Sequence, residues 1–431
     1  MTELPIIVAG GGIGGLFAAV AIARSGRPVA LLERAAEFGP IGYGIQLGPN
    51  ALHTFERLGL LDEVLSHCSL LDEGLLSDAT DGSTLARLPM GRAMVERFGQ
   101  PYAVIHRADL HHVLLDACAA LPGVSLRTDF EVVCFDDRGD RVVVHAKGGD
   151  SLQGSLLVAA DGIWSAIRQQ LFPEVGLPLT SRYAAFRCVC PIAQVDPGLA
   201  RNVVNLRCGT NFHMIHYPLR GGTLFNLVAA TRVPDGVAMD DRGGVVAHFD
   251  EVFDGACEEV RALVPLVDRS RFWAISNLQP LREWVRGRVV LIGDAAHAMV
   301  QAMAQGACQA VEDGYVLAKH LAAADDPAQA ALAYQAERHI RATDTQYRSL
   351  FMWELIHATG GWRDLRRAKL EKMTPADVLA GLDWLYSAAP GSELAGELGP
   401  SERHATGDHA TERYVRAAGL PDPAAASALH G

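Results

Sequence analysis

The sequence lacks any long apolar segment. Nowhere do 18 apolar residues follow one another without interruption, which is about the length that a membrane-spanning helix needs, so we expect no transmembrane segment. The apolar run Ile6–Val8 is too short for the core of a secretory signal, and no basic residues precede it. We therefore expect a cytoplasmic protein.

The sequence also has fewer basic than acidic residues, and it has no cysteine or histidine pattern typical of a metal site. The 38 Lys and Arg residues are outnumbered by 50 Asp and Glu residues, and the resulting net charge of -12 argues against a nucleic-acid partner. The eight cysteines are scattered, and Cys188 and Cys190 are not followed by a second Cys or His pair at zinc spacing. We expect reduced thiols, mostly in the core, and no metal site.

The chain does contain enough apolar residues for a substantial core. Its 431 residues are 49% hydrophobic and 20% charged, values typical of a globular enzyme with about two to three domains.

A glycine-rich motif follows the first predicted strand, Leu4–Ala9. Gly10, Gly12 and Gly15 occupy the three glycine positions of the G-x-G-x-x-G fingerprint, ahead of an apolar helical segment. A second strand, Val29–Leu32, is closed by Glu33, at the distance where a carboxylate accepts hydrogen bonds from a ribose diol. The pattern predicts dinucleotide binding, with an adenosine ribose that carries no 2′-phosphate.

Two later segments carry charged residues next to predicted elements. Arg107 begins an amphipathic helix, an unfavourable place for a cation, so it predicts a bound phosphate or flavin edge or, alternatively, a structural salt bridge. A buried strand, Leu156–Ala160, ends in Asp161-Gly162, and Arg168 follows at helical spacing.

The segment from Arg288 to Asp313 contains a buried strand that stops at Gly293-Asp294, followed later by a helix. The Asp294 carboxylate can accept hydrogen bonds from sugar hydroxyls, and a helix N-terminus favours anionic atoms. The alternative is that these two residues form only a turn. We expect Glu312 and Asp313 to anchor the helix rather than to take part in chemistry.

The middle of the chain predicts antiparallel strands joined by hairpins, at Val203–Arg207, Phe212–Tyr217 and Leu224–Ala230. Alternation places His213 and Tyr217 on one face of such a sheet. A histidine with a pKa near the working pH is a suitable proton acceptor for a phenol. The alternative is that His213 is a packing residue.

Together these motifs resemble the single-component (group A) FAD-dependent aromatic hydroxylases, the family of p-hydroxybenzoate and salicylate hydroxylases. The resemblance covers residues from about 4 to 325 and rests on Gly10–Gly15 with Glu33, on Asp161-Gly162 with Arg168, and on Gly293-Asp294 with His297. It implies that these motifs, together with Arg107, bind FAD, and that the motif of Asp161-Gly162 and Arg168 also serves NAD(P)H. It also implies that NADH, rather than NADPH, reduces the flavin and that a C4a-hydroperoxyflavin hydroxylates the substrate.

Within the family, one position favours a subgroup. Most members have proline four residues after the histidine of Gly-Asp-Ala-Ala-His, whereas this chain has Gln301. That departure, with His213 and Tyr217 on the substrate strand, resembles the 3-hydroxybenzoate 6-hydroxylases, which make gentisate. The resemblance implies that His213 and Gln301 contact the substrate and that Tyr217 lines its pocket.

The implied fold is α/β, with a Rossmann-like FAD-binding domain of the p-hydroxybenzoate hydroxylase type, an antiparallel β-sheet substrate domain and a C-terminal helical segment. The predicted FAD domain covers residues 1–75, 101–178 and 278–345, the substrate domain covers 76–100 and 179–277, and the C-terminal segment and tail cover 346–431. A homodimer is the candidate assembly. The rival functions are the same chemistry on salicylate, a hydroxypyridine or a flavonoid, a flavin-binding regulator without turnover, and an oxidase that releases peroxide.

Overall fold

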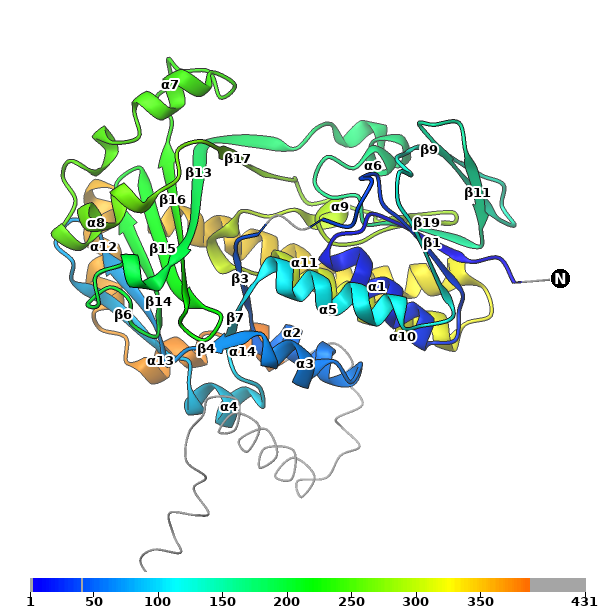
Figure 1. The fold of residues 1–431 in the computed structure, drawn as a ribbon, viewed down its shortest axis with the longest axis horizontal. Coiled ribbons are helices and arrows are strands. Elements are labelled where there is room, and N and C mark those ends of the chain that lie inside the picture. Colours follow the sequence, from blue (N-terminus) through cyan, green and yellow to red (C-terminus); the bar gives the residue numbers. More distant parts are fainter. Residues whose placement is uncertain (1–2, 40–41, 388–431) are drawn as a thin grey trace, which may run out of the picture. The chain divides into compact units, whose positions relative to one another are not determined.

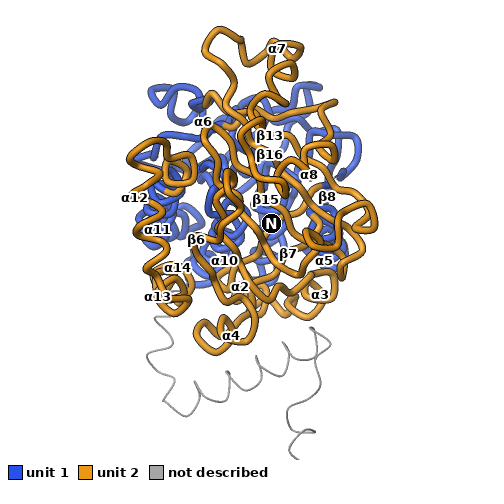
Figure 2. Tube along the Cα trace, turned by 90° about the vertical axis from the view of Figure 1, so that its left-hand side faces the viewer, with its two compact units in different colours: residues 1–42, 107–180, 276–351 blue, residues 43–106, 181–275, 352–431 orange. Residues whose placement is uncertain are grey.

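The structure is a computed structural model that describes residues 3–39 and 42–387 (Figure 1). Contacts between Cα atoms divide the chain into two compact units (Figure 2). Unit 1 consists of Met1–Gly42, Arg107–Thr180 and Ser276–Phe351, and unit 2 of Tyr43–His106, Ser181–Ile275 and Met352–Gly431. The assignment of particular residue ranges to an FAD domain and a substrate domain stays a prediction. The part of the predicted C-terminal tail beyond residue 387 lies outside the described residues.

Unit 1 is built on a six-stranded sheet. Its strands, in spatial order, are β18 (Val285–Arg286), β19 (Val289–Leu291), β12 (Leu156–Ala159), β1 (Ile6–Ala9), β2 (Val29–Leu32) and β8 (Val124–Arg127). All neighbours are parallel except β18 and β19. The central strands β1, β2, β12 and β19 are apolar and buried at every position, as expected for a parallel sheet that is covered on both faces.

Helices and a small second sheet complete unit 1. The helices are α1 (Ile13–Arg24), α5 (Arg107–Ala119), α6 (Ala166–Leu171), α9 (Asp294–His297), α10 (Gly306–Ala323) and most of α11 (Pro327–Ile356). Helix α1 packs against α5 and α10. The antiparallel strands β9 (Val132–Asp137), β10 (Val142–Ala146) and β11 (Ser151–Gly154) form the second sheet.

Unit 2 contains a seven-stranded sheet, with the order β17 (Phe272–Asn277), β13 (Leu179–Pro191), β16 (Leu224–Arg232), β15 (Phe212–Leu219), β14 (Val203–Gly209), β5 (Glu73–Asp78) and β6 (Thr84–Pro89). Strands β13, β16, β15 and β14 pair antiparallel, while β14 and β5 are parallel. A smaller antiparallel sheet has the order β3 (Gly44–Leu47), β7 (Ala103–His106) and β4 (Cys68–Leu70).

Short helices surround these sheets. They are α2 (Pro49–Arg57), α3 (Leu61–Ser66), α4 (Arg92–Phe98), α7 (Arg242–Ala247), α8 (Glu258–Leu263), α12 (Gly360–Leu370), α13 (Pro375–Ala380) and α14 (Asp383–Tyr386). The 3-10 turns within residues 3–39 and 42–387 are Pro173–Val175, Ile192–Gln194, Glu251–Phe253, Val264–Leu266 and Gln301–Met303. None of the helices in the described residues is both long and apolar enough to cross a membrane.

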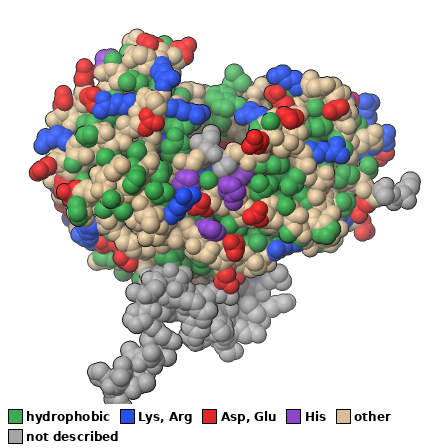
Figure 3. Space-filling view, viewed as in Figure 1, with side chains coloured by type: hydrophobic (Ala, Val, Ile, Leu, Met, Phe, Trp, Pro, Cys, Tyr) green, Lys and Arg blue, Asp and Glu red, His purple; other side chains and the backbone are tan. Residues whose placement is uncertain are grey.

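The two faces of the seven-stranded sheet differ in chemistry. One face carries aromatic and aliphatic side chains that form a buried core with those of α7, α8 and their connections, among them Phe186, Met214, Phe225, Phe249 and Phe253. The opposite face carries His213, Tyr217, Arg187 and Asn226, because successive side chains of a strand alternate. We call these four residues the polar face. On the surface shown in Figure 3, acidic and basic side chains are interspersed.

Candidate active site

Gly10 and Gly15 are required by the packing of unit 1 itself. Gly10 has a φ of +117°, and a Cβ atom there would lie 2.3 Å from the Ala160 carbonyl oxygen. A Cβ atom on Gly15 would lie 1.9 Å from the Gly10 carbonyl oxygen. The turn between β1 and α1 therefore has room for backbone only at both positions.

Gly12 is different, because nothing in the described protein requires glycine there. Its φ of -77° is open to any residue, and a Cβ atom would meet no atom within 4 Å. Gly12 is the N-cap of α1, where no side chain caps the helix, and it lines a cavity of about 440 Å³. The open space is therefore available to a ligand, next to the helix N–H groups and dipole that favour an anion.

This cavity lies where the carboxyl ends of β1, β2 and β12 meet, the usual ligand position in a parallel sheet. Its wall includes Gly10, Gly12, Glu33, Arg107, His111, Asp161 and Trp164. Glu33 is held firmly: Oε2 accepts the Gly11 N–H at 2.8 Å, and Oε1 accepts the Ala35 N–H at 2.9 Å. The carboxylate therefore fixes the glycine turn and still has lone pairs for ribose hydroxyls.

Asp161 presents an acceptor to the same cavity. Its Oδ2 accepts the Ile167 N–H at 3.3 Å, whereas Oδ1 is buried with no hydrogen-bond partner among residues 3–39 and 42–387. Burial raises the pKa of this carboxyl, although a hydrogen bond from Ser165 opposes the shift. A buried oxygen without a donor is costly in the protein alone, so this atom suits a ligand hydroxyl.

Arg168 lies outside the wall of the cavity. Only 1% of it is exposed, and its guanidinium donates to the Ile163 oxygen at 2.6 Å and the Ala295 oxygen at 3.1 Å. Burial lowers its pKa, and the charge of Asp161 opposes that shift. In this structure Arg168 joins the loop after β12 to helix α9, and its predicted cofactor contact stays a prediction.

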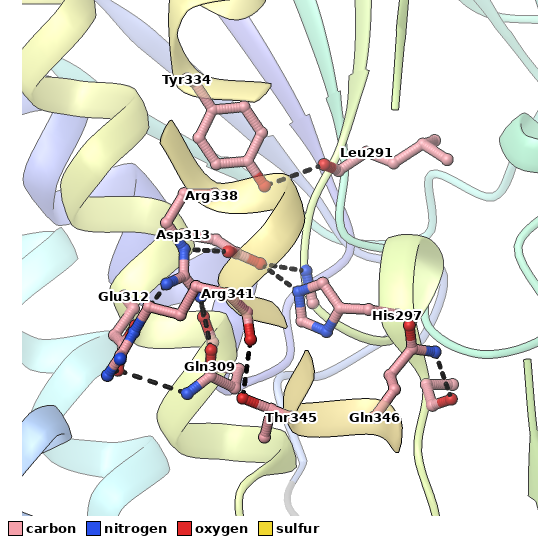
Figure 4. Close-up of polar contacts among 12 residues, drawn as sticks. Leu291, His297, Gln309, Glu312, Asp313, Tyr334, Arg338, Arg341, Thr345 and Gln346 are labelled. Carbon is pink, nitrogen blue, oxygen red and sulfur yellow. Dashed lines mark hydrogen bonds and ion pairs between the residues drawn. The ribbon is translucent and has the colours of Figure 1, made fainter. Parts of the chain in front are cut away.

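The Gly293-Asp294 turn rests on the buried carboxylate of Asp313, whose contacts with His297 and Arg338 are drawn in Figure 4. Gly293, with a φ of +57°, donates its N–H to Oδ2 of Asp313 at 2.9 Å. The same oxygen lies 2.6 Å from Nε2 of His297, and Oδ1 accepts from Nε of Arg338 at 2.9 Å. Burial alone would raise the pKa of Asp313, but His297 and Arg338 outweigh it and hold the pKa below its usual value.

Glu312 extends this network. It pairs with Arg338 and accepts two hydrogen bonds from Arg341, at 2.7 Å from Nε and 2.9 Å from Nη2. Glu312, Asp313 and Arg338 are at most 1% exposed. These two acidic residues therefore anchor α10 to α11, and no sequence pattern identified Arg338 as their partner.

Two predicted cofactor residues interact electrostatically. Burial raises the pKa of Asp294, whereas His297 and Arg107 act to lower it. Burial lowers the pKa of Arg107, and the charge of Asp294 opposes that change. The charge that compensates Arg107 at the start of α5 thus comes from the Gly293-Asp294 turn, and Arg107 also lines the cavity.

On the polar face of unit 2, His213 and Tyr217 are each 2% exposed. Burial lowers the pKa of His213 well below its usual value, and His357 and Arg187 lower it further. The lowered pKa differs from the expected pKa near the working pH. The imidazole of the free protein is therefore neutral and can accept a proton, but it is a weaker base than expected. Burial raises the pKa of Tyr217, so its hydroxyl stays protonated and hydrogen-bonds with Gln46.

Two neighbours on this face were not identified from the sequence. Arg187 on β13 acts electrostatically on both His213 and Tyr217, and its guanidinium lies 5.7 Å from the centre of the Tyr43 ring. Asn226, opposite Tyr217 on β16, accepts the Gly44 N–H at 2.8 Å through Oδ1. Its Nδ2 is buried and has no acceptor among the described residues.

Gln301 begins a 3-10 turn of unit 1 and is half-buried. The predicted catalytic residues therefore come from both units, with His213 and Tyr217 in unit 2.

Comparisons with known proteins identify the family of this chain. Residues 3–349 match the family described as FAD binding domain. The 3-hydroxybenzoate 6-hydroxylase 1 of Aquipseudomonas alcaligenes is 39% identical over 385 residues, which are 88% of this chain and 97% of that protein. The 3-hydroxybenzoate 6-hydroxylase of Polaromonas naphthalenivorans (strain CJ2) is 37% identical, over 91% of this chain and 98% of that one.

Solved structures show the same fold. Klebsiella pneumoniae HpxO complexed with FAD and uric acid gives a TM-score of 0.81 at 26% identity, covering 90% of this chain and 97% of that one. A salicylate hydroxylase substrate complex gives 0.73 at 26% identity, covering 91% of this chain and 97% of that one. The chain belongs to the FAD-binding family of flavoprotein aromatic hydroxylases. The predicted family, fold class, enzyme class and FAD cofactor are confirmed at this level.

Proposed function

We propose that this protein hydroxylates a small phenolic acid with NADH and O₂, and that 3-hydroxybenzoate is converted to gentisate. The observation that carries the proposal is the polar face of unit 2. A neutral imidazole, a protonated phenol, a guanidinium and an amide occupy one side of a sheet, and the other side contributes Met214, Phe225 and other side chains to the buried core alongside His216 and Arg207. The names of the relatives that are 39% and 37% identical support the choice of substrate.

FAD fits the cavity of unit 1. Gly12 leaves open space beside the uncapped N-terminus of α1, which suits the pyrophosphate, and Glu33 suits the adenosine ribose. The unpaired oxygen of Asp161 suits a further hydroxyl, while Arg107, Gly293 and Asp294 are assigned to the ribityl and phosphate portion. When bound, FAD supplies the redox chemistry through which electrons from NADH activate O₂.

His213 is assigned the role of proton acceptor. A phenolate attacks an electrophilic oxygen better than a phenol does, so the substrate O–H bond breaks and an N–H bond forms on the imidazole. Because His213 is neutral in the free protein, it needs no prior deprotonation. Gln301 is assigned a contact with the substrate, and Tyr217, which stays protonated, lines the pocket and can donate a hydrogen bond.

The substrate carboxylate is assigned to Arg187 and Asn226. The guanidinium of Arg187 supplies the positive charge that pairs with a carboxylate. It acts electrostatically on both His213 and Tyr217, so this charge is close to the residues assigned to the substrate. The Nδ2 group of Asn226 is a buried donor whose missing acceptor a carboxylate oxygen can supply. A phenol with a carboxylate therefore suits this face better than a neutral phenol.

A homodimer is proposed from the surface of α11. Its side chains Leu332, Ile340, Tyr347 and Phe351 are 47% to 74% exposed and recur at helical spacing, which forms an apolar stripe. Light scattering at several protein concentrations tests this assembly. A dimeric mass is expected, and a monomer at all concentrations would contradict it.

A panel of phenols tests the substrate. The purified flavoprotein is mixed with 3-hydroxybenzoate, salicylate, 4-hydroxybenzoate or 6-hydroxynicotinate, and NADH and NADPH are compared as reductants. We expect the highest kcat/KM with NADH and 3-hydroxybenzoate, and gentisate rather than 2,3- or 3,4-dihydroxybenzoate as the product. A hydroxylated product from another phenol only would keep the reaction and replace the substrate.

A further inference from the structure

A second histidine lies directly against His213. Nδ1 of His213 is 2.9 Å from Nε2 of His357, and the two ring centres are 5.0 Å apart. The two histidines are 144 positions apart in the sequence: His213 lies on β15, and His357 directly follows the last residue of α11. Both are in unit 2, and both are buried, with exposed fractions of 2% and 8%.

The hydrogen bonds of this pair determine which nitrogen atoms carry hydrogen. Nδ1 of His357 lies 2.8 Å from the carbonyl oxygen of Trp353, and a carbonyl can only accept, so Nδ1 of His357 carries the hydrogen. Burial lowers the pKa of His357 to about 4, so its ring is neutral near neutral pH and its Nε2 is an acceptor. Nδ1 of His213 must then be the donor. In neutral His213 this leaves the Nε2 lone pair free.

The surroundings hold both rings in place. The ring of Trp353 packs edge-on against His213 at 5.4 Å between centres, and the ring of Tyr183 lies 4.4 Å from that of His357. The charged groups that act on the pair are Arg187, which acts on His213, and Arg366, which acts on His357. Both cations disfavour protonation, so neither supplies the acceptor that Nδ1–H of His213 needs. His357 is the group that does.

We propose that His357 is a positioning residue for the hydroxylation, because it holds His213 in the tautomer whose Nε2 can accept the phenol proton. The inference rests on the proposed function, in which His213 is the proton acceptor. When the phenol O–H bond breaks, the new N–H bond forms at Nε2 of His213 and the electron pair stays on the phenolate oxygen. The Nδ1–H···Nε2 hydrogen bond to His357 remains in place during this transfer.

Without His357, the Nδ1–H of His213 would be a buried donor with no acceptor. The other tautomer avoids that cost by moving hydrogen to Nε2, where it blocks proton acceptance. In the serine-protease triad, holding the catalytic histidine in the wrong tautomer lowers kcat by up to about 10⁴-fold. Because His213 can still rotate or exchange here, we expect a loss of roughly 10- to 100-fold.

Nuclear magnetic resonance of histidines labelled with ¹⁵N tests the tautomer without any turnover. The holoenzyme is compared with His357→Phe, which keeps a ring but no acceptor, and with His357→Gln, which keeps an acceptor. His213→Asn identifies the resonances of His213. We expect the Nδ1–H tautomer in the wild type and in His357→Gln, and a shift toward Nε2–H in His357→Phe. An Nε2–H tautomer in the wild type would overturn the proposal.

Kinetics supply the second readout. His357→Phe is expected to lower kcat for 3-hydroxybenzoate by at least about 10-fold with little change in KM, and His357→Gln to restore most of it. Equal kcat in the wild type and His357→Phe, or an equal loss in both variants, would overturn the role of His357. Absence of hydroxylated product from the wild type would refute the proposed function instead, while the tautomer measurement would still decide the pairing.

Discussion

His297 and Asp313 share a hydrogen bond of 2.6 Å in the buried interior of unit 1, and the same carboxylate oxygen accepts the N–H of Gly293. One oxygen atom thus fixes both ends of the short element that carries Asp294. The position of this turn relative to β19 and α10 depends on the charged carboxylate of Asp313 inside the core. Arg338 neutralises the charge of this carboxylate.

Breaking this network should be costly. Arg338→Leu removes the guanidinium partner of Asp313 in the core and leaves Glu312 with Arg341 alone, and we expect the free energy of unfolding to fall by about 3–5 kcal/mol. Glu337→Gln is the control, since it removes an exposed pair with Lys319 and should cost about 1 kcal/mol or less. Urea unfolding measures both, and similar losses in the two variants would contradict this account.

Two glycines of the first motif should respond differently to alanine. Gly15→Ala places a Cβ atom 1.9 Å from a carbonyl oxygen, so we expect a strong loss of stability and poor folding. Gly12→Ala meets no protein atom within 4 Å, so the apoprotein should lose about 1 kcal/mol or less, yet FAD affinity should fall. Thermal unfolding of the apoproteins and flavin fluorescence during FAD titration test this. Unchanged FAD affinity in Gly12→Ala would place the pyrophosphate elsewhere.

Asp78 should make part of the free energy of unfolding depend on pH in the acidic range. Burial would raise its pKa, but hydrogen bonds from Arg363 and the Thr80 N–H outweigh that effect and lower the pKa to about 2. A carboxyl with a lowered folded-state pKa stabilises the fold above its unfolded pKa of 3.8 and loses that contribution as pH falls toward 2. Asp78→Asn should therefore cost about 2 kcal/mol or more near pH 7. Its stability difference from the wild type should shrink between about pH 4 and pH 2. A difference that does not change over this range would contradict the assignment.

Removing the proposed proton acceptor should separate chemistry from cofactor binding. His213→Ala should retain FAD but lower the rate of hydroxylation by about 100-fold or more. Because the pKa of free His213 is lowered well below its usual value, kcat/KM should not fall through its protonation between about pH 8 and pH 6. Initial rates of product formation over this range measure both. An unchanged rate in the variant would remove His213 from the mechanism.

Arg187 should distinguish acids from neutral phenols. Arg187→Met keeps the length of the side chain and removes the charge, so the Kd for 3-hydroxybenzoate should rise by about 10-fold or more. The affinity for 3-hydroxybenzamide, which has no carboxylate, should change little. Binding of both compounds is measured by perturbation of the flavin spectrum. Equal weakening for both would show that Arg187 does not meet the carboxylate.

Local sequence patterns predicted the elements of both units well. The glycine fingerprint placed β1, α1 and β2, and the alternation around His213 placed β15 with His213 and Tyr217 on one face of the sheet. These features depend on neighbours within a few residues, so periodicity and turn chemistry are sufficient to find them. The finer role of Arg168 was not visible, because its partners are backbone carbonyls and any sequence can supply those.

The pairings that the sequence could not show are all long-range. His357 is 144 residues from His213, and Arg338 is 25 residues from Asp313 on a different helix. The expected pKa of His213 was wrong for the same reason, since burial and the fields of His357 and Arg187 come from distant segments. Asn226 could not be identified because an unpaired amide is recognisable only once every neighbour is placed.

The most direct test of the central claim is incorporation of ¹⁸O from ¹⁸O₂ during turnover with NADH and 3-hydroxybenzoate. The account predicts a single labelled oxygen atom in each molecule of gentisate and a matching amount of NADH consumed, because a monooxygenase transfers one oxygen atom and reduces the other to water. Consumption of NADH with hydrogen peroxide as the only product, from every phenol of the panel, would contradict it.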